Sequence, residues 1–252
     1  MTLDDALSPL LGGDRFHTLN GRCERHGEHD FLTVKSNPVW RCPECLLERA
    51  SIDAANQALK DRKERFFRLA GFPEKYRGAA FVASTTAHRS TRGIAKLFFE
   101  GVLQREGWAV LLMTGEPGTG KTLMACELGQ RLIEKGCMSV KYTTAMGLLG
   151  AIKASYGRDD SSEEMVIEDY ATYDLLIIDE IDQQRCSEND RLLIGEVINR
   201  RYNSGRPMIS ISNQSRDTLA ASVGDRVADR FAENCYAAVF DWPSFRRTKG
   251  AA

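Results

Sequence analysis

Eight consecutive residues in the middle of the chain have the composition and spacing of a loop that binds phosphate. From residue 115 to residue 122 they read Gly-Glu-Pro-Gly-Thr-Gly-Lys-Thr, which matches the pattern G-x-x-x-x-G-K-T. Glycines allow successive backbone N–H groups to point at phosphate oxygens, and a helix that follows adds the positive end of its dipole. We expect Lys121 to contact the β- and γ-phosphates and the Thr122 hydroxyl to hold Mg²⁺. The candidate nucleotide ligands are Gly115, Glu116, Pro117, Gly118, Thr119, Gly120, Lys121 and Thr122.

The sequence on either side of this loop supplies the elements that such a loop needs. Residues 108–113 form an apolar run before it, and residues 123–133 carry apolar side chains at helical spacing after it. The alternative is a chance glycine turn, which requires neither a strand before it nor a helix after it. The order strand, loop, helix therefore favours a nucleotide site.

Two acidic residues follow a second apolar run. Residues 175–178 are Leu-Leu-Ile-Ile, which is typical of a parallel strand buried on both faces, and Asp179 and Glu180 come directly after them. Open α/β sheets bind ligands at the carboxyl ends of their strands, so we expect Asp179 to hold Mg²⁺ through water and Glu180 to polarise an attacking water. A further buried strand, residues 207–213, ends in Asn213. Its amide can reach a γ-phosphate or the attacking water, and the alternative is a loop-capping asparagine.

Four potential metal ligands lie in two half-sites towards the N-terminus. Cys23-x-x-His26 and Cys42-x-x-Cys45 are separated by about fifteen residues, the spacing of a zinc ribbon or knuckle. Four protein ligands leave no position for water, so we expect a structural zinc that stabilises a short hairpin. His29 is the rival fourth ligand, ranked below His26 because His26 repeats the two-residue spacing. The alternative is a set of free thiols with a surface histidine, and the four remaining cysteines are expected to be buried thiols.

Two arginines near the C-terminus have helical spacing. Residues 224–231 read Gly-Asp-Arg-Val-Ala-Asp-Arg-Phe, so Arg226 and Arg230 are four apart and share one face of a helix. A guanidinium fits a transferring phosphate because its rigid fork neutralises spread charge. A pair of surface salt bridges would give the same spacing.

Strands and helices alternate over most of the chain. Residues 1–20 are expected to be a loose lead, residues 159–164 an exposed acidic turn, and residues 31–35 and 39–41 short strands around a turn at 36–38. The remaining expected elements are helices at 46–69, 91–104, 145–156 and 187–203 and strands at 139–144 and 237–242, the last at a sheet edge. This pattern predicts an α/β fold with a central parallel sheet flanked by helices, preceded by a small zinc-binding module and a helix.

Composition limits the classes of function. The 252 residues are 42% apolar and 27% charged, as in soluble globular proteins, and a turn at 71–73 divides residues 1–70 from a nucleotide domain at 71–252. A net charge of −1 excludes a general attraction to nucleic acid. A DNA contact must therefore be local, either on the basic residues at 60–68 or in the nucleotide domain. A basic run of this kind is more often a solvated helix face than a DNA contact. An acidic N-terminus and the lack of an apolar segment of about 20 residues predict a cytoplasmic protein without membrane contact.

Together these segments resemble the AAA+ ATPases of the DnaC-type replicative helicase loaders, and the IstB-type transposition helpers are similar. The resemblance covers residues 70–247 and is carried by GEPGTGKT, DLLIIDE, NRRYNSGRPMISISN, GDRVADRF and FDWPSFR. It implies that ATP binds to Lys121 and Thr122, that Mg²⁺ is held through Asp179, that Glu180 is catalytic and that Asn213 is a sensor.

The same resemblance assigns roles to three arginines. It implies that Arg230 is a finger inserted into a neighbouring subunit's site, supported by Arg226, and that Arg246 is a second sensor. A finger that acts in trans implies self-association, so that the ATPase works only as an assembly. One departure concerns the loop after the acidic pair, where Asp182 stands in place of the glycine that is common in the family.

The resemblance implies an ATP-dependent loader that places a replicative DNA helicase on single-stranded DNA, with residues 1–70 holding the helicase. Two alternatives stay open at this point. One is an IstB-type helper that coats duplex DNA, and the other is a nucleotide-gated adaptor with negligible hydrolysis. The sequence leaves open the helicase partner, the stoichiometry and a host or phage origin.

Overall fold

The computed structural model of the chain describes residues 16–34, 37–157, 162–182, 187–215, 218–219 and 223–248. The chain divides into two compact units between Arg62 and Lys63, inside the helix α2 (Pro43–Leu69). This division precedes the boundary expected at residues 70 and 71 because Phe66 and Phe67, in the last turns of α2, pack against the core of the larger unit. The assignment of separate functions to residues 1–70 and 71–252 stays a prediction.

The smaller unit contains a three-stranded antiparallel sheet in the order β1-β2-β3. Its strands are β1 (Phe16–Cys23), β2 (Gly27–Val34) and β3 (Asn37–Arg41). The expected loose lead is therefore wrong for residues 16–20, which pair with β2. The tight turn at residues 24–26 joins β1 to β2, and it belongs to the first Cys-x-x-His half-site. The turn expected at 36–38 is wrong for Asn37 and Pro38, which belong to β3. Residues 1–15 and 35–36 lie outside the described part.

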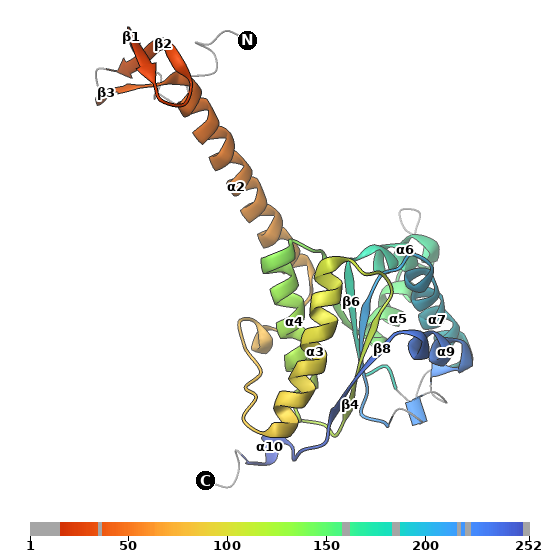
Figure 1. Cartoon of the computed structure of the whole chain (residues 1–252). Coiled ribbons are helices and arrows are strands. Elements are labelled where there is room, and N and C mark those ends of the chain that lie inside the picture. Colours follow the sequence, from red (N-terminus) through yellow and green to blue (C-terminus); the bar gives the residue numbers. More distant parts are fainter. Residues whose placement is uncertain are drawn as a thin grey trace. The chain divides into compact units, whose positions relative to one another are not determined.

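The larger unit is built on a five-stranded parallel sheet in the order β5-β6-β7-β4-β8 (Figure 1). The strands are β4 (Val110–Gly115), β5 (Val140–Thr144), β6 (Leu175–Asp179), β7 (Met208–Ile211) and β8 (Cys235–Phe240). The predicted parallel α/β sheet is confirmed, and β8 lies at its edge as expected. The strand that carries the phosphate loop, β4, lies between β7 and β8.

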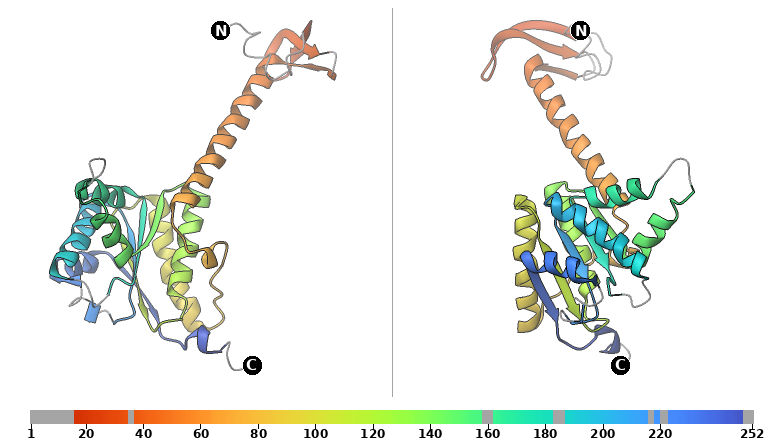
Figure 2. Two further views of the ribbon diagram at one scale, coloured as in Figure 1. Left: turned by 180° about the vertical axis from the view of Figure 1, so that it is seen from behind. Right: turned by 90° about the vertical axis from the view of Figure 1, so that its right-hand side faces the viewer.

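Helices cover both faces of this sheet (Figure 2). One face carries α3 (Thr86–Gln104) and α4 (Lys121–Gly136), and the other carries α5 (Ala145–Lys153), α6 (Glu163–Thr172), α7 (Glu188–Asn203) and α9 (Asp225–Glu233). The unit also contains the short helices η2 (Glu74–Tyr76) and α10 (Phe245–Thr248).

Alternating strand residues build a separate core on each face. In β4, Leu111 and Met113 pack on the α3–α4 side, whereas Val110 and Leu112 pack on the side of α5 and α7. The residues of β6 alternate in the same way and are all buried. A continuous apolar run is thus what a strand covered on both faces requires.

Local capping explains two differences from the expected helices. α3 begins five residues earlier than expected because Thr85 and His88 form a capping box at its start. Part of the expected acidic turn is also wrong, since Ser162 accepts a hydrogen bond from the backbone of Met165 and starts α6 at Glu163. Acidic residues in a first turn suit the helix dipole. Residues 158–161 lie outside the described part.

Candidate functional site

The phosphate loop connects the end of β4 to the start of α4. Its glycines Gly115, Gly118 and Gly120 have φ angles of 136°, 85° and 100°, in the region that favours glycine. A Cβ atom at Gly115 would lie 2.2 Å from the carbonyl oxygen of Phe240 in β8. The loop therefore needs glycine both for its turns and for its close approach to the neighbouring strand.

The segment after β8 packs directly on this loop. The Nε1 atom of Trp242 donates to the carbonyl of Thr119 at 2.9 Å, and the backbone N–H of Phe245 donates to the carbonyl of Gly118 at 3.0 Å. A Cβ atom built on Gly118 would come within 3.3 Å of Cδ of Arg246. The structure thus places Arg246 beside the loop, which suits the sensor role predicted for it.

Lys121 is buried, and its charge is held by the loop itself. Its Nζ donates to the carbonyls of Gly115 at 2.6 Å and Glu116 at 2.9 Å. Burial lowers the pKa of Lys121, and the nearby carboxylates of Asp179 and Asp182 oppose this shift. Phosphate oxygens are stronger acceptors than carbonyls for an ammonium group, so the Lys121 side chain can exchange these carbonyls for a nucleotide.

Asp179 lies at the end of β6, within hydrogen-bonding distance of the phosphate-loop helix. Its Oδ2 accepts from the hydroxyl of Thr122 at 2.8 Å and from the hydroxyl of Tyr142 at 2.9 Å. Burial and the Asp179 charge raise the pKa of Tyr142, so its hydroxyl stays a neutral donor. Asp179 and Thr122 together offer oxygen ligands of the kind that Mg²⁺ takes. Tyr142 was missed in the sequence because its contact depends on the register of β5 against β6.

The backbone after Asp179 has an unusual conformation. Glu180 has a φ of 55°, although it is not glycine, and its backbone N–H donates to Oδ1 of Asp179 at 2.9 Å. Such left-handed residues cost on the order of 1–3 kcal/mol and cluster at functional sites. The turn directs Glu180 away from the strand, and its side chain is exposed. This placement agrees with the prediction of a carboxylate that faces water.

Asn213 is held next to the same site by Asp182. The buried Asp182 carboxylate accepts the backbone N–H of Asn213 at 3.0 Å, which ties the loop after β6 to the loop after β7. Asn213 lines a cavity of about 740 Å³ with Gly115 and Glu116 of the phosphate loop. Asp182, where the resemblance has glycine, therefore positions the predicted sensor.

The arginine pair on α9 lies at the other end of the sheet. The carbonyl of Arg230 accepts from Nε1 of Trp108, which precedes β4, whereas the phosphate loop follows β4. The Arg230 guanidinium lies over the ring of Tyr202, 5.3 Å from its centre, and Arg226 is exposed one turn earlier. Neither arginine is brought to the phosphate loop of its own chain, so their catalytic roles stay predictions about a neighbouring subunit.

Four side chains in the smaller unit converge as a candidate metal centre. The ligand atoms of Cys23, His26, Cys42 and Cys45 all lie within 4.8 Å of one another. The Cys23 and Cys45 sulfurs are 3.7 Å apart, and Nδ1 of His26 lies 3.3–3.7 Å from the three sulfurs. A tetrahedral zinc with bonds of about 2.3 Å to sulfur and about 2.0 Å to nitrogen needs edges of roughly 3.5–3.8 Å. The residues therefore fit a zinc ion, and the side chain of His29 lies outside the described part.

Glu48 orients the histidine of this cluster. Its carboxylate lies 3.0 Å from Nε2 of His26, on the ring edge opposite Nδ1, and also pairs with Arg25 at 2.9 Å. A carboxylate behind a ligating histidine fixes the tautomer and the ring orientation. Glu48 could have been located from the sequence, because it follows the candidate ligand Cys45 by about one helical turn.

We predict that Glu48→Ala lowers zinc affinity by about 10–100-fold, because Nδ1 of His26 loses its fixed orientation. The control is Asp53→Ala, which removes an exposed carboxylate from the same helix. Competition with a chromophoric chelator measures both proteins. Equal affinities would show that Glu48 does not support the metal centre.

The remaining cysteines contribute no further cluster within the described residues. Cys126 is buried, and Cys137 and Cys235 are partly exposed, so burial is confirmed for the first alone. Burial raises the pKa of Cys126 to about 12. Cys186 lies outside the described part. None of the described helices is long and apolar enough to cross a membrane.

The phosphate loop follows β4, an inner strand of the parallel sheet, and an acidic residue from the next-but-one strand is hydrogen-bonded to the helix after the loop. This arrangement defines a nucleotide-binding protein with the AAA+ fold. Residues 44–247 match the family model described as IstB-like ATP binding protein. The chain belongs to this family. The predicted resemblance to the DnaC and IstB group is thereby confirmed.

Curated relatives match almost end to end. The replicative helicase loader DnaC of Escherichia coli (strain K12) is 26% identical over 236 residues, which cover 93% of this chain and 95% of the relative. DnaC of Buchnera aphidicola subsp. Schizaphis graminum is 30% identical over 214 residues, 83% of this chain and 85% of the relative. A further relative from Escherichia coli (strain K12), the uncharacterized protein YdaV, is 27% identical over 241 residues, 94% of this chain and 95% of the relative.

Solved structures share the fold. The crystal structure of the DnaC helicase loader superposes with a TM-score of 0.57 at 21% identity, covering 66% of this chain and 99% of that chain. The replication initiator DnaA bound to AMPPCP and single-stranded DNA gives a TM-score of 0.58 at 19% identity, covering 69% of this chain and 52% of that chain. These likenesses show the AAA+ fold.

Proposed function

We propose that this protein is an ATP-dependent helicase loader. It binds a replicative DNA helicase, helps to place it on single-stranded DNA and hydrolyses ATP in an oligomeric assembly in the cytoplasm. The observation that carries the proposal is the near end-to-end match to the DnaC loaders in a chain whose phosphate loop and Asp179 are joined through Thr122. Residues 1–70 would hold the helicase, and residues 71–252 would form the ATPase domain.

We assign a separate role in ATP hydrolysis to each residue around the phosphate loop. Lys121 would neutralise the β- and γ-phosphates, and Thr122 and Asp179 would hold Mg²⁺, which supplies charge stabilisation for phosphoryl transfer when it is bound. Glu180 would accept a proton from the attacking water, and Asn213 would orient that water. Arg246 would contact the nucleotide from the segment after β8, and Arg230 with Arg226 would complete a neighbour's site.

Glu180→Gln is expected to lower the rate of hydrolysis by about 10²–10⁴-fold, because an amide cannot accept the proton of the attacking water. ATP binding should change little, since the Glu180 side chain is exposed and the substitution leaves the phosphate loop itself unchanged. Phosphate release and a nucleotide titration measure the two effects separately. A Glu180→Gln protein that loads the helicase like the wild type would favour the nucleotide-gated adaptor.

Arg230→Ala should lower hydrolysis by about a thousandfold in the assembled state, as arginine fingers do in related phosphoryl transfers. Mixing provides the sharper test. Arg230→Ala subunits keep an intact site but lack the finger, whereas Glu180→Gln subunits keep the finger but lack the base. An equimolar mixture should regain activity that neither protein has alone. No recovery, or normal hydrolysis by Arg230→Ala, would exclude a finger in trans, and Arg191→Ala on the exposed face of α7 is the control.

The family match supports a second candidate function, because the matching family model carries the IstB name. An IstB-type helper would coat duplex DNA and recruit a transposase. ATPase rates with single-stranded and duplex DNA at one fixed salt concentration separate the two, since phosphate contacts depend strongly on salt. Stimulation by single strands alone would support the loader, and equal or stronger stimulation by duplex would favour the helper.

A further inference from the structure

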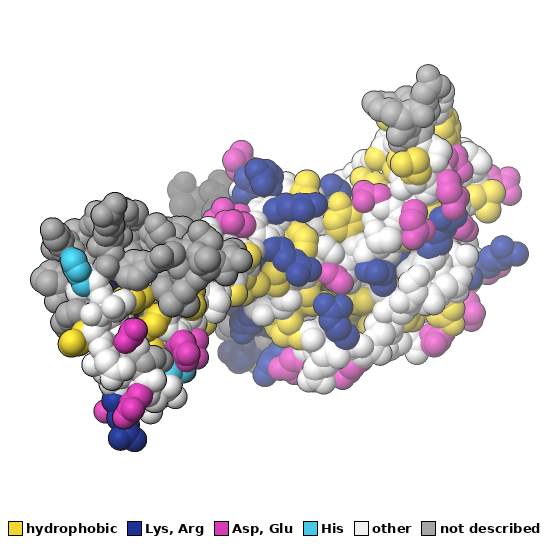
Figure 3. Space-filling view, turned by 90° about the horizontal axis from the view of Figure 1, so that it is seen from above, with side chains coloured by type: hydrophobic (Ala, Val, Ile, Leu, Met, Phe, Trp, Pro, Cys, Tyr) yellow, Lys and Arg dark blue, Asp and Glu magenta, His cyan; other side chains and the backbone are white. Residues whose placement is uncertain are grey.

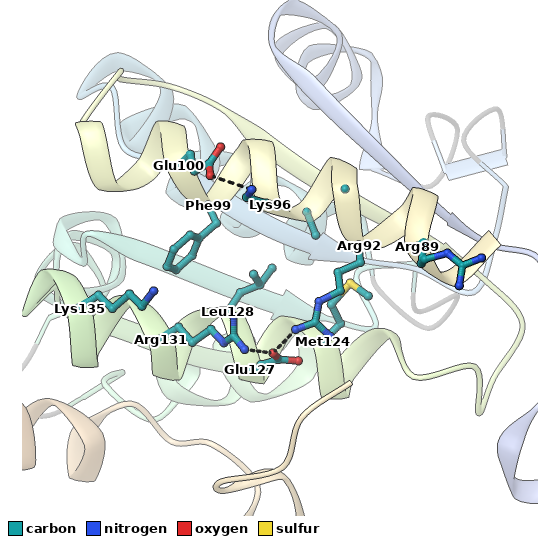
Figure 4. A pocket seen from close by; sticks show the side chains of 12 residues that line it. Arg89, Arg92, Lys96, Phe99, Glu100, Met124, Glu127, Leu128, Arg131 and Lys135 are labelled. Atoms are coloured by element: carbon teal, nitrogen blue, oxygen red, sulfur yellow. Dashed lines mark hydrogen bonds and ion pairs between the residues drawn. The ribbon is translucent and has the colours of Figure 1, made fainter. Parts of the chain in front are cut away.

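A groove lies between α3 and α4, and none of its lining residues belongs to the phosphate loop (Figure 4). Its volume is about 380 Å³, which is in the range of sites for small or narrow ligands. Its floor contains apolar side chains from both helices, among them Phe99 and Leu128. We call this space the α3–α4 groove, and its charged lining residues are Arg89, Arg92, Lys96, Glu100, Glu127, Arg131 and Lys135.

Cations outnumber carboxylates along this groove. The two acidic side chains are both engaged, Glu100 with Lys96 at 3.5 Å and the buried Glu127 with Arg92 and Arg131. Arg89 and Lys135 have no carboxylate within ion-pairing distance among the residues that the structure describes. On the face shown in Figure 3, basic and acidic side chains are interspersed. The groove is therefore a local cationic site in a chain with a net charge of −1.

The arrangement of these cations suits a chain of phosphates. Arg89, Arg92 and Lys96 recur at about one helical turn, so their positive charges repeat roughly every 5 Å along α3. Arginine forks match phosphate oxygens in two-point contacts, and an apolar floor can take the flat face of a base. The groove volume of about 380 Å³ is that of a site for a small ligand, which favours contact with a short stretch of one strand.

We propose that the α3–α4 groove binds backbone phosphates of single-stranded DNA, and that its occupation weakens nucleotide binding at the phosphate loop. The proposal rests on the proposed function for its choice of DNA as the polyanion. The site itself is separate from the phosphate loop, to which it is connected by Glu127 and Phe81.

Glu127 and Arg92 hold both backbone polar groups of Phe81. One carboxylate oxygen of Glu127 accepts the backbone N–H of Phe81 at 2.7 Å. The other pairs with Arg92 at 3.0 Å and with Arg131 at 2.9 Å. Arg92 also donates to the carbonyl of Phe81. The position of Phe81 therefore depends on the same arginines that face the groove.

The ring of Phe81 in turn supports the phosphate loop. A Cβ atom at Gly120 would lie 2.9 Å from this ring, so the ring packs directly against the loop. The ring also packs against Trp242, 6.0 Å between centres, and Trp242 donates to Thr119. A phosphate that draws Arg92 and Arg131 away from Glu127 would loosen Phe81 and, through it, the loop that binds ATP.

The binding test is a charge reversal with a matched control. Arg89→Glu/Lys135→Glu changes exposed groove residues, and Arg77→Glu/Arg191→Glu makes the same change in net charge on exposed residues outside both the groove and the basic segment 60–68. Fluorescence anisotropy with a labelled oligo-dT at fixed salt should show at least a tenfold loss of affinity for the groove variant and less than a threefold change for the control.

Each other outcome of this titration has a definite meaning. If the wild-type protein does not bind the oligonucleotide, the proposed function is wrong about single-stranded DNA as a partner, and the inference fails with it. If the wild type binds and the groove variant binds equally well, or both variants lose affinity alike, the inference alone is overturned. A groove variant that keeps DNA binding but loses the helicase would assign the groove to an acidic protein segment and also overturn it.

The coupling test uses Glu127→Gln. Glutamine keeps a carbonyl acceptor for the Phe81 backbone but loses the charge that attracts Arg92 and Arg131. In the wild type, saturating oligo-dT should weaken binding of a fluorescent ATP analogue by about fivefold or more, within the usual range of coupling between sites. In Glu127→Gln the effect of the oligonucleotide should fall below twofold. No effect of DNA in the wild type, or the same effect in both proteins, would overturn the coupling.

Discussion

Lys121→Ala is expected to weaken ATP binding by about a hundredfold or more and to remove hydrolysis with it. The Lys121 ammonium is held at the loop by two carbonyls, and a bound nucleotide would replace them with phosphate oxygens. Hydrogen bonds to charged groups contribute roughly 1.5–3 kcal/mol each, and about 1.4 kcal/mol corresponds to a factor of ten in affinity. Two such contacts therefore account for a loss of this size.

The measurement is a titration with a fluorescent ATP analogue, combined with thermal unfolding. Lys141→Ala is the control, because Lys141 is a lysine on a strand of the same sheet, and its contact is with the carbonyl of Leu69. The fold should survive in both variants, since the substitution at 121 removes a buried charge. A loss of less than threefold for Lys121→Ala would show that the loop does not bind nucleotide through this residue.

Removal of zinc should unfold the sheet of the smaller unit and leave ATP binding unchanged. Few described residues of this unit are buried, Leu32 and Cys42 among them, so its strands have little apolar surface to stabilise them. A structural zinc supplies roughly 10–16 kcal/mol of apparent binding free energy in comparable small modules. Without the ion, β1, β2 and β3 lose their main source of stability.

Hydrogen exchange before and after chelation measures unfolding of the small sheet. An ATP titration on the same sample measures nucleotide binding. Fast exchange is expected over residues 16–41, and Cys42→Ser should behave like the chelated protein. Protection that survives chelation would mean that the four side chains are free thiols and a histidine rather than a metal centre. Loss of ATP binding together with zinc would contradict the division of the chain into two units.

The sequence was most informative where chemistry requires fixed spacing. Gly115 to Thr122, the pair Asp179 and Glu180, and the two metal half-sites could all be located because each pattern is local. In the structure, the members of each group lie close to one another. Their catalytic and ligating roles stay predictions, because placement alone does not demonstrate them.

Contacts between distant segments could not be predicted in the same way. Tyr142 reaches Asp179 only because β5 pairs with β6 in one register, and Asp182 reaches Asn213 only because the β6 and β7 loops are adjacent. Phe81 lies in a segment without regular structure, so no periodicity indicates that it packs on Gly120. The strand β1 was missed because residues 24–26, which join it to its partner β2, were interpreted only as part of a metal half-site.

The position of β4 in the sheet determines which part of the chain can fold first during synthesis. Both neighbours of β4 are made after it, and Trp242, which bonds Thr119, is made later still. At about 5–20 residues per second, a ribosome needs roughly 6–25 seconds to pass from Thr119 to Trp242. All four candidate zinc ligands, by contrast, lie between Cys23 and Cys45. We therefore expect a nascent chain to assemble the candidate metal centre early, and the phosphate loop only when its last strand has joined the sheet.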